Sequence, residues 1–291
     1  MVLSVLMMHC PYCKRPATKR DGYDQRGRQR YGCRPCHRDF TADSTSAFAG
    51  YRWPTDVILT TVRWYASYPM SATHVMQLLA ERHIDVSART VLNWVQTFGP
   101  QLTKVLHGYR RRLGRRWYVD EVFCFRGKQK RYLYRAIDQH GQVIDILLRD
   151  KRDRASAEAF FRRALGQTGT SPHTVISDHH QPYLKAVAHM LPSTCHIRTG
   201  LHRAKGETTK PIERSHVPTR DRLRGTRGLK TVVTGQRFLE CFEGLHALRR
   251  GDVKLRGLVP GYRPTRATPH ETARAVMVAM NVLGGQLKKA A

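Results

Sequence analysis

The sequence predicts a multidomain α/β protein, with two small N-terminal modules and a larger core built on a mixed β-sheet. Three observations predict this fold class. Paired cysteines stand near the N-terminus, an apolar period of three to four residues follows, and the period changes to two from Trp117 onward. A chain of 291 residues also fits several modules better than one core. We expect module boundaries at residues 1–48, 49–108, 109–116, 117–250 and 251–291.

The charge of the chain predicts a nucleic acid partner. Lys and Arg number 51 against 22 Asp and Glu, so the net charge is +29. An ordinary metabolic enzyme gains nothing from so strong a field, whereas a polyanion-binding protein gains steering and affinity. The 41% hydrophobic content excludes a disordered basic tail. No stretch approaches the ~18–20 apolar residues of a membrane span, so we expect a cytoplasmic, nucleoid-associated protein with no membrane partner.

Residues 1–48 are predicted to form a zinc ribbon. Two C-x2-C knuckles, Cys10-Pro-Tyr-Cys13 and Cys33-Arg-Pro-Cys36, are separated by 19 residues. Four thiolates can complete a closed tetrahedral site, so we expect structural Zn²⁺ that provides most of the stability of this short segment. The alternative is four free or disulfide-linked cysteines in a loop. The small apolar floor of the ribbon is expected to contain Tyr23, Tyr31 and Phe40.

Residues 49–108 are predicted to form a helix-turn-helix DNA-binding module. Apolar residues recur at helical spacing over residues 57–65, Ser71 opens a second helix, and Ser87 is a suitable N-cap for a third. Two short helices joined by a tight turn, with polar residues early on the second, match the DNA-binding motif. An unrelated helical hairpin is the alternative. The residues expected to face a major groove are Ser87, Ala88, Arg89, Thr90 and Asn93.

The order of elements after residue 108 predicts a ribonuclease-H-like fold. Five arginines and no acid in residues 109–116 predict a basic linker that lies on phosphates. Three strands, a helix, a strand, a helix, a strand and a helix then follow. The strands are expected at residues 117–125, 132–138, 143–148, 174–178 and 194–198, and the first two helices at 155–165 and 181–191. Residues 251–291 are expected to be helical.

Three acids of this core are candidates for binding a metal ion. Asp120 lies mid-strand, Asp178 ends a strand, and Glu213 begins a helix whose first turn contains Pro211. Strand alternation places Glu121 on the opposite face from Asp120. Converging carboxylates can hold two magnesium ions about 3.5–4 Å apart, because hard cations prefer oxygen ligands. The alternative is that these are ordinary surface or capping acids, with Asp138, Asp145 and Glu207 as rival candidates.

Several motifs in this region carry a family resemblance. They include Trp-Tyr-Val-Asp-Glu at 117–121, Tyr-Leu-Tyr-Arg-Ala-Ile-Asp at 132–138, and Ile212-Glu213-x-x-His216. Asp178 and Glu213 are separated by 34 residues. Over roughly residues 50–255 the chain resembles the bacterial DDE transposases of insertion-sequence family six. In that family the glutamate usually follows a pair of asparagines, whereas Thr209-Lys210 stand here, and Pro218 should stop the helix near Val217.

The resemblance implies phosphoryl transfer on DNA. Asp120, Asp178 and Glu213 are then the catalytic residues and ligands of Mg²⁺ (or Mn²⁺). Cleavage at the element ends frees a 3′-hydroxyl, which attacks a target phosphodiester, and family members join the two DNAs into a cointegrate. The protein is expected to act as a homodimer or larger assembly on double-stranded DNA. The basic residues expected to hold the strands near the acids are Arg203, Lys205, Lys210, Arg214 and Lys230.

Two other function classes remain open at this level. A zinc-ribbon and helix-turn-helix regulator explains the first 105 residues but needs no ordered acids in an α/β core. A ribonuclease-H-like nuclease without strand transfer keeps the acids but lacks end-specific binding. Strand joining with an oligonucleotide that carries the element ends separates these classes.

Overall fold

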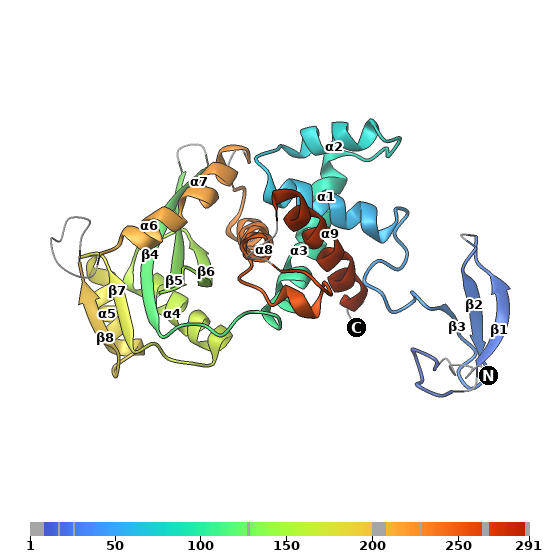
Figure 1. Cartoon of the computed structure of the whole chain (residues 1–291), viewed down its shortest axis with the longest axis horizontal. Helices are drawn as coiled ribbons and strands as arrows, with labels where there is room; N and C mark the ends of the chain where they lie inside the picture. Colours follow the sequence, from blue (N-terminus) through green and yellow to red (C-terminus); the bar gives the residue numbers. More distant parts are fainter. Residues whose placement is uncertain are drawn as a thin grey trace.

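A computed structural model describes residues 9–16, 18–25, 27–126, 129–199, 208–226, 229–263 and 268–288. Figure 1 shows a small three-stranded sheet set apart from the rest, a group of helices in the middle, and a five-stranded sheet at the far end. In the described part of the chain, no helix combines the length and apolarity that crossing a membrane requires.

The N-terminal sheet has the antiparallel order β1-β2-β3. Its strands are β1 (Thr18–Tyr23), β2 (Gln29–Cys33) and β3 (Asp39–Thr41). Phe40 is buried against the cysteines and stacks on Tyr31, with ring centroids 5.6 Å apart. The prediction that Tyr23 belongs to this floor is wrong, because Tyr23 is 68% exposed. It lies at the far end of the hairpin, after a register shift between Arg20 and Tyr23.

Three helices follow. They are α1 (Thr55–Ser67), α2 (Ala72–Ala80) and α3 (Ala88–His107). Ser71 and Ser87 cap α2 and α3 as predicted, since their hydroxyls accept hydrogen bonds from backbone N–H groups. Helices α2 and α3 form where the sequence predicts them, but α3 is longer than the short helix expected. Residues 81–87 separate α2 from α3, and α3 is 20 residues long because its second half packs against a later helix.

The larger sheet has the strand order β6-β5-β4-β7-β8. Strands β4, β5 and β6 pair antiparallel, and β7 and β8 run parallel to β4, so the sheet is mixed as predicted. The predicted order of strands and helices is confirmed and is consistent with a ribonuclease-H-like core. The bounds are β4 (Arg116–Arg126), β5 (Gln129–Asp138), β6 (Val143–Arg149), α4 (Arg154–Thr168), β7 (Thr174–Ser177), α5 (Gln181–Met190) and β8 (Cys195–Arg198).

Both faces of this sheet are covered by helices. Helices α4 and α5 bury Phe160, Phe161 and Tyr183 against one face. Helix α8 (Val232–Arg250) covers the other face and also contacts α3, so it lies between the sheet and the helical part (Figure 1). Gly99 of α3 permits this approach, because a Cβ there would lie 2.8 Å from the Cβ of Cys241 in α8. Sheet and helices therefore share one apolar core.

The remaining helices surround this core. They are α6 (Lys210–Ser215), α7 (Val217–Arg224), the 3₁₀ turn Leu255–Gly257 and α9 (Pro269–Gln286). The helix that carries Glu213 ends before Pro218, as predicted, and Pro218 occupies the first turn of α7. The basic segment 109–116 does not behave as a simple linker. Arg110 donates to the Ile144 carbonyl at 3.0 Å and pairs with Val253, which holds it against the core.

Candidate active site and zinc centre

Adjacent strands bring Asp120 and Asp178 together. Strand β4 pairs in parallel with β7 in the register Tyr118 to Ile176. Two residues further along this register, Asp120 lies alongside Asp178, which directly follows β7. Neighbouring strands are ~4.8 Å apart, so the two carboxylates emerge at one edge of the sheet.

Helix α6 brings Glu213 to the same edge. Its Ile212 is fully buried in the core next to β4, which fixes the helix against the strand that carries Asp120. The Thr209 hydroxyl donates a hydrogen bond to Glu213 Oε1 at 2.7 Å. Thr209 therefore orients this carboxylate. The sequence could show only that Thr209 replaces a family asparagine.

The electrostatics of Asp120 reflect its burial and the acids around it. Burial, followed by the negative charge of Glu121 and smaller contributions from Asp178 and Glu213, raises the pKa of Asp120 to about 7. Among the described residues, the carboxylate oxygens of Asp120, Asp178 and Glu213 are not all within 4.8 Å of one another. A cation among them would relieve the repulsion, and carboxylate oxygens are the ligands that Mg²⁺ prefers. The residues present fit a divalent metal.

Glu121 belongs to the other face of the sheet. Its carboxylate accepts a hydrogen bond from the Tyr183 hydroxyl of α5 at 2.5 Å, as strand alternation predicts. Arg152 forms an ion pair with Glu121 and also lies 3.5 Å from Asp178 Oδ2. The other oxygen of Asp178 accepts the backbone N–H of His180 at 3.0 Å. Arg152 thus connects Glu121 to Asp178, and its place in a loop gave no sequence signal.

A buried arginine anchors the end of α6. Arg135 of β5 donates to both carboxylate oxygens of Glu243 in α8, at 2.9 and 3.0 Å. Its other nitrogen donates to the Ser215 carbonyl at 2.9 Å and hydroxyl at 2.7 Å. Arg135 therefore links the sheet, α8 and the last residue of α6. Sequence reasoning missed this residue, because a single arginine in an apolar strand does not reveal its partner.

His216 lies beside the first acid. It is fully buried, and its Nδ1 lies 3.8 Å from Asp120 Oδ2. Burial lowers the pKa of His216 to about 3, and the charges of Arg135 and Arg220 contribute to the decrease. The imidazole beside Asp120 is therefore neutral at physiological pH.

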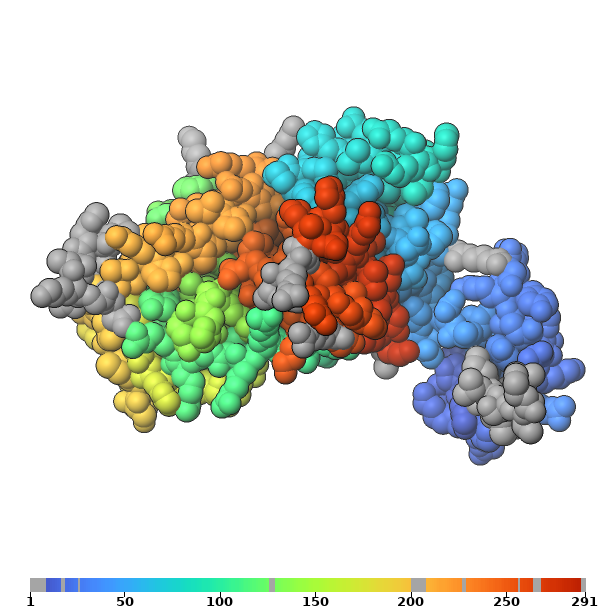
Figure 2. All heavy atoms as spheres, viewed as in Figure 1, coloured from blue at the N-terminus to red at the C-terminus, as the bar shows by residue number. Residues whose placement is uncertain are grey.

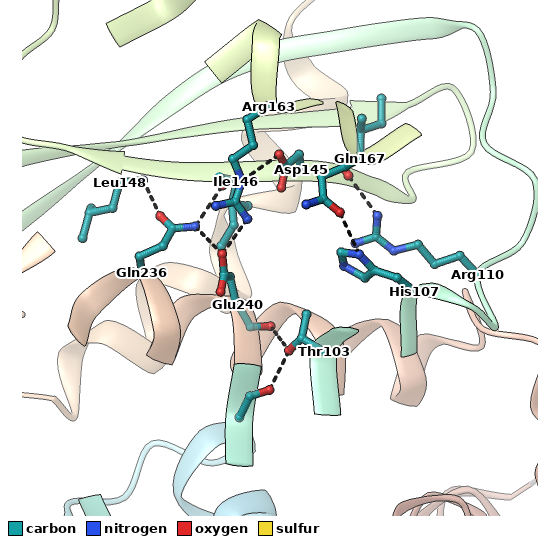
Figure 3. A network of polar contacts seen from close by, with 12 residues as sticks. Thr103, His107, Arg110, Asp145, Ile146, Leu148, Arg163, Gln167, Gln236 and Glu240 are labelled. Atoms are coloured by element: carbon teal, nitrogen blue, oxygen red, sulfur yellow. Dashed lines mark hydrogen bonds and ion pairs between the residues drawn. The ribbon is translucent and has the colours of Figure 1, made fainter. Parts of the chain in front are cut away.

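The rival acids lie elsewhere. Asp138 accepts backbone N–H bonds from Gly114, His140 and Gln142, which makes it a turn-capping residue. Asp145 pairs with Arg163 at 2.9 Å, and Arg163 also binds Glu240 in the network of Figure 3. That network joins α3, α4, α8 and β6 and is structural. Glu207 lies outside the described residues.

The predicted DNA-contacting residues fall into three groups. Arg89 and Asn93 are exposed one turn apart on α3, whereas the Ser87 hydroxyl is engaged with Thr90 at the helix start. Lys210, Arg214 and Lys230 are exposed, and the first two flank Glu213 on α6. Arg203 and Lys205 lie outside the described residues.

The four knuckle cysteines converge on one point. Their sulfur atoms all lie within 4.8 Å of one another, with Cys10 to Cys36 at 3.6 Å and Cys13 to Cys33 at 3.5 Å. Sulfurs bound to one tetrahedral zinc ion, each ~2.3 Å from it, are about 3.8 Å apart. A disulfide would need ~2.05 Å. The cluster therefore fits a zinc ion.

The two knuckles repeat one backbone geometry. The backbone carbonyls of Cys10 and Cys33 accept hydrogen bonds from the N–H groups of Lys14 and His37, at 2.9 and 2.8 Å. Lys14 and His37 both have positive φ, 62° and 54°. Burial alone would raise the pKa of Cys10, but hydrogen bonds from its own knuckle and from neighbouring thiols lower it to about 6. At Cys10 the turn thus favours the thiolate, the form that binds metal, whereas burial raises the pKa of Cys33 in the second knuckle to about 12.

Comparison with known proteins finds relatives over most of the chain. Residues 114–252 match a protein family described as a DDE domain. The transposase for the insertion sequence-like element IS431mec of Staphylococcus aureus is 30% identical over 206 residues, 70% of this chain and 91% of that protein. The transposase of IS257 in transposon Tn4003, also from Staphylococcus aureus, has the same identity and coverage. A solved structure of the simian T-cell lymphotropic virus intasome with PP2A regulatory subunit B56 gamma is also similar. The match covers 57% of this chain and 49% of the chain in that structure, at 14% identity and a TM-score of 0.30.

Proposed function

Because this chain belongs to the bacterial DDE transposases of insertion-sequence family six, we propose that Asp120, Asp178 and Glu213 are its catalytic triad. Membership makes the chain an enzyme that cleaves DNA and transfers strands. The single observation that carries the triad is geometric: the β4–β7 register and the packing of α6 on β4 bring Asp178 and Glu213 toward Asp120. Burial and, after it, the charge of Glu121 raise the pKa of Asp120 to about 7, with smaller contributions from Asp178 and Glu213. Neighbouring acids whose burial and mutual repulsion raise a pKa indicate a cation site.

The triad is proposed to hold Mg²⁺ or Mn²⁺. When bound, these ions supply Lewis acidity for activating water and for stabilising the leaving oxygen of a phosphodiester. The chain keeps the ligands in place: Thr209 holds Glu213 and the His180 N–H holds Asp178. Lys210 and Arg214 offer positive charge on both sides of Glu213 for the scissile strand.

Residues 1–108 are proposed to recognise the ends of the element. Helices α2 and α3 would act as a helix-turn-helix, with α3 entering the major groove. The exposed positions of Arg89 and Asn93 early on α3 support this role. The ribbon of residues 1–48, held by structural Zn²⁺, would add a second DNA contact. Residues 117–250 are proposed to form the catalytic domain, and residues 251–291 a helical segment packed on α1.

Both element ends must be held together for joining, so we propose a homodimer or larger assembly on double-stranded DNA. Donor and target are proposed to join into a cointegrate. The deciding experiment is strand joining in Mg²⁺, with an oligonucleotide duplex that carries an element end and a supercoiled target plasmid. Joined product supports the proposal. Cleavage without joining would indicate a nuclease, and binding without cleavage would indicate a regulator.

A further inference from the structure

A cavity of about 660 Å³ lies where α1, α7, α8 and α9 meet. Its lining includes Arg63, Arg222, Arg249 and Arg250, and we call it the arginine cavity. The volume is within the range of about 300–1,000 Å³ that is usual for ligand pockets. Figure 2 shows the surfaces of α7, in orange, and α9, in red, next to each other on the face in view.

The arginine cavity has an excess of positive charge. Among the lining residues that the structure describes, Asp221 alone is acidic, and it is paired at 3.2 Å with Arg224, which is not in the lining. Burial and the like charge of Arg249 lower the pKa of Arg63, although the neighbouring Tyr68 opposes this shift. An anion in the cavity would relieve this repulsion.

The cavity also contains hydrogen-bonding atoms without partners among the described residues. These atoms are Arg63 Nε, Ser67 Oγ and Arg222 Nη1. Arg222 is only 2% exposed, and its other nitrogens donate to the carbonyls of Ala66 and Tyr65, which fixes the guanidinium in place. Buried polar groups in native proteins nearly always have a partner. The lining is therefore built for a ligand with several acceptor oxygens.

We propose that the arginine cavity binds a backbone phosphate of the DNA strand held at the catalytic triad. A phosphate supplies the negative charge and the acceptor oxygens that the lining lacks, and guanidinium groups match it geometrically. The inference rests on the proposed function, because the strand must first lie at Asp120, Asp178 and Glu213.

The position of the cavity favours DNA as the source of the phosphate. Pro218 lines the cavity and follows Glu213 by five residues. His216, which joins α6 to α7, keeps helical backbone angles, so these five residues span about 8 Å. Two nucleotides rise about 7 Å along one strand. A strand with one phosphate at Glu213 can therefore bring another to the arginine cavity.

The test uses the full-length, zinc-loaded protein and a duplex oligonucleotide, with binding measured in calcium at several salt concentrations. Arg249→Gln and Arg63→Gln should each weaken binding several-fold and lower the slope of log affinity against log salt by about 0.9, the value of one phosphate contact. Arg249→Lys, which keeps the charge, should retain most of the affinity. Arg162→Gln is the matched control, because Arg162 is exposed on α4 over the other face of the sheet.

Equal slopes for Arg63→Gln, Arg249→Gln and Arg162→Gln would overturn the proposal. A second arm titrates inorganic phosphate and follows the melting temperature. If phosphate stabilises the wild type but not Arg63→Gln, and DNA binding is the same in both, the site takes free phosphate and the DNA assignment is wrong. Each measurement is repeated on an unrelated duplex. A wild-type protein that binds both duplexes equally would contradict the proposed function. The change in the slope of log affinity against log salt can be measured on either duplex.

Discussion

Asp120 lies directly opposite Arg135 in the antiparallel ladder of β4 and β5. The guanidinium of Arg135 is engaged by Glu243 and Ser215, so it fixes the end of α6. Asp120 faces the neutral His216 and the other acids. Arg135, on the neighbouring strand β5, therefore uses its charge to position the helix that carries Glu213 and does not neutralise the acids around Asp120.

Arg135→Lys should therefore reduce both stability and strand transfer. Lysine keeps the charge but cannot bind both oxygens of Glu243 and Ser215 at once, so we expect a loss of stability smaller than the ~3–5 kcal/mol that removing one partner of a buried pair costs. At a temperature where the variant is folded, we expect transfer to fall about tenfold or more while DNA affinity stays the same. Melting curves, transfer rates and binding check this expectation.

Arg163→Lys is the control for that variant, since Arg163 also holds two acids, Asp145 and Glu240, but away from the triad (Figure 3). It should lose stability without a specific loss of transfer. An Arg135→Lys protein that melts like the wild type and transfers strands at full rate would show that this arginine does not position α6.

The order of elements was predictable because it depends on local periodicity. Alternation over β4 correctly separated Asp120 from Glu121, and Ser71 and Ser87 were correct as caps because capping needs only nearby backbone. The length of α3 was not predictable. It depends on Gly99 meeting Cys241, a contact between residues far apart in the sequence.

The same limit applies at the site. Spacing and resemblance pointed to the three acids, but the partners of Arg135 and Arg152 come from other elements. Tyr23 failed as a core residue because a register shift in β1, which composition does not reveal, precedes it.

The raised pKa of Asp120 predicts a pH-dependent cost to stability. The pKa of Asp120 is about 7 in the folded protein and near 3.8 in the unfolded chain. Between pH 3.8 and pH 7, Asp120 is therefore protonated in the folded state and ionised in the unfolded state. The cost of the charge is therefore full above pH 7 and vanishes toward pH 4. Without magnesium, Asp120→Asn should be more stable than the wild type at pH 8, on the order of 2–4 kcal/mol. Urea unfolding at pH 8 and pH 5 measures this gain, and an equal difference at both pH values would contradict the assignment.

Removing a knuckle thiolate should release zinc. Cys33→Ser replaces a thiolate ligand by a weak one, so we expect zinc content to fall from one ion per chain to nearly none and binding to an element end to weaken. The helices and larger sheet should still melt cooperatively, because the ribbon has its own apolar cluster. Cys195→Ser, an exposed cysteine outside the cluster, is the control and should keep its zinc. A Cys33→Ser protein with one bound zinc ion and normal end binding would refute the zinc centre.

Arg89 and Asn93 should contribute base readout, since both are exposed one turn apart after the Ser87 cap. A base-specific contact contributes about 1–3 kcal/mol of discrimination. Alanine at either position should reduce the preference for an element end over unrelated DNA by roughly 5- to 150-fold, with a smaller change in nonspecific affinity. Lys104→Ala, exposed near the other end of α3, should leave the preference intact. Equal losses on both DNAs would indicate phosphate contacts instead.

Amide variants of Asp120, Asp178 and Glu213 test the enzyme assignment directly. Asn and Gln are nearly isosteric with the acids, so the fold should remain, but the charge that retains the metal is lost. Cleavage and strand transfer in magnesium should fall by a factor of about 10²–10³ or more. DNA binding in calcium should survive or tighten slightly, because a negative group near the phosphates has gone.

The control for this series is Asp145→Asn. Asp145 is a buried acid of the same domain. It pairs with Arg163 at 2.9 Å and does not belong to the triad. Its variant should lose some stability but keep substantial transfer activity when assayed below its melting temperature. Full strand transfer by Glu213→Gln would remove Glu213 from the triad, since a glutamine cannot replace the charge of a metal-binding carboxylate. Equal losses in Asp145→Asn and the triad variants would instead mean that the assay reports folding and not metal binding.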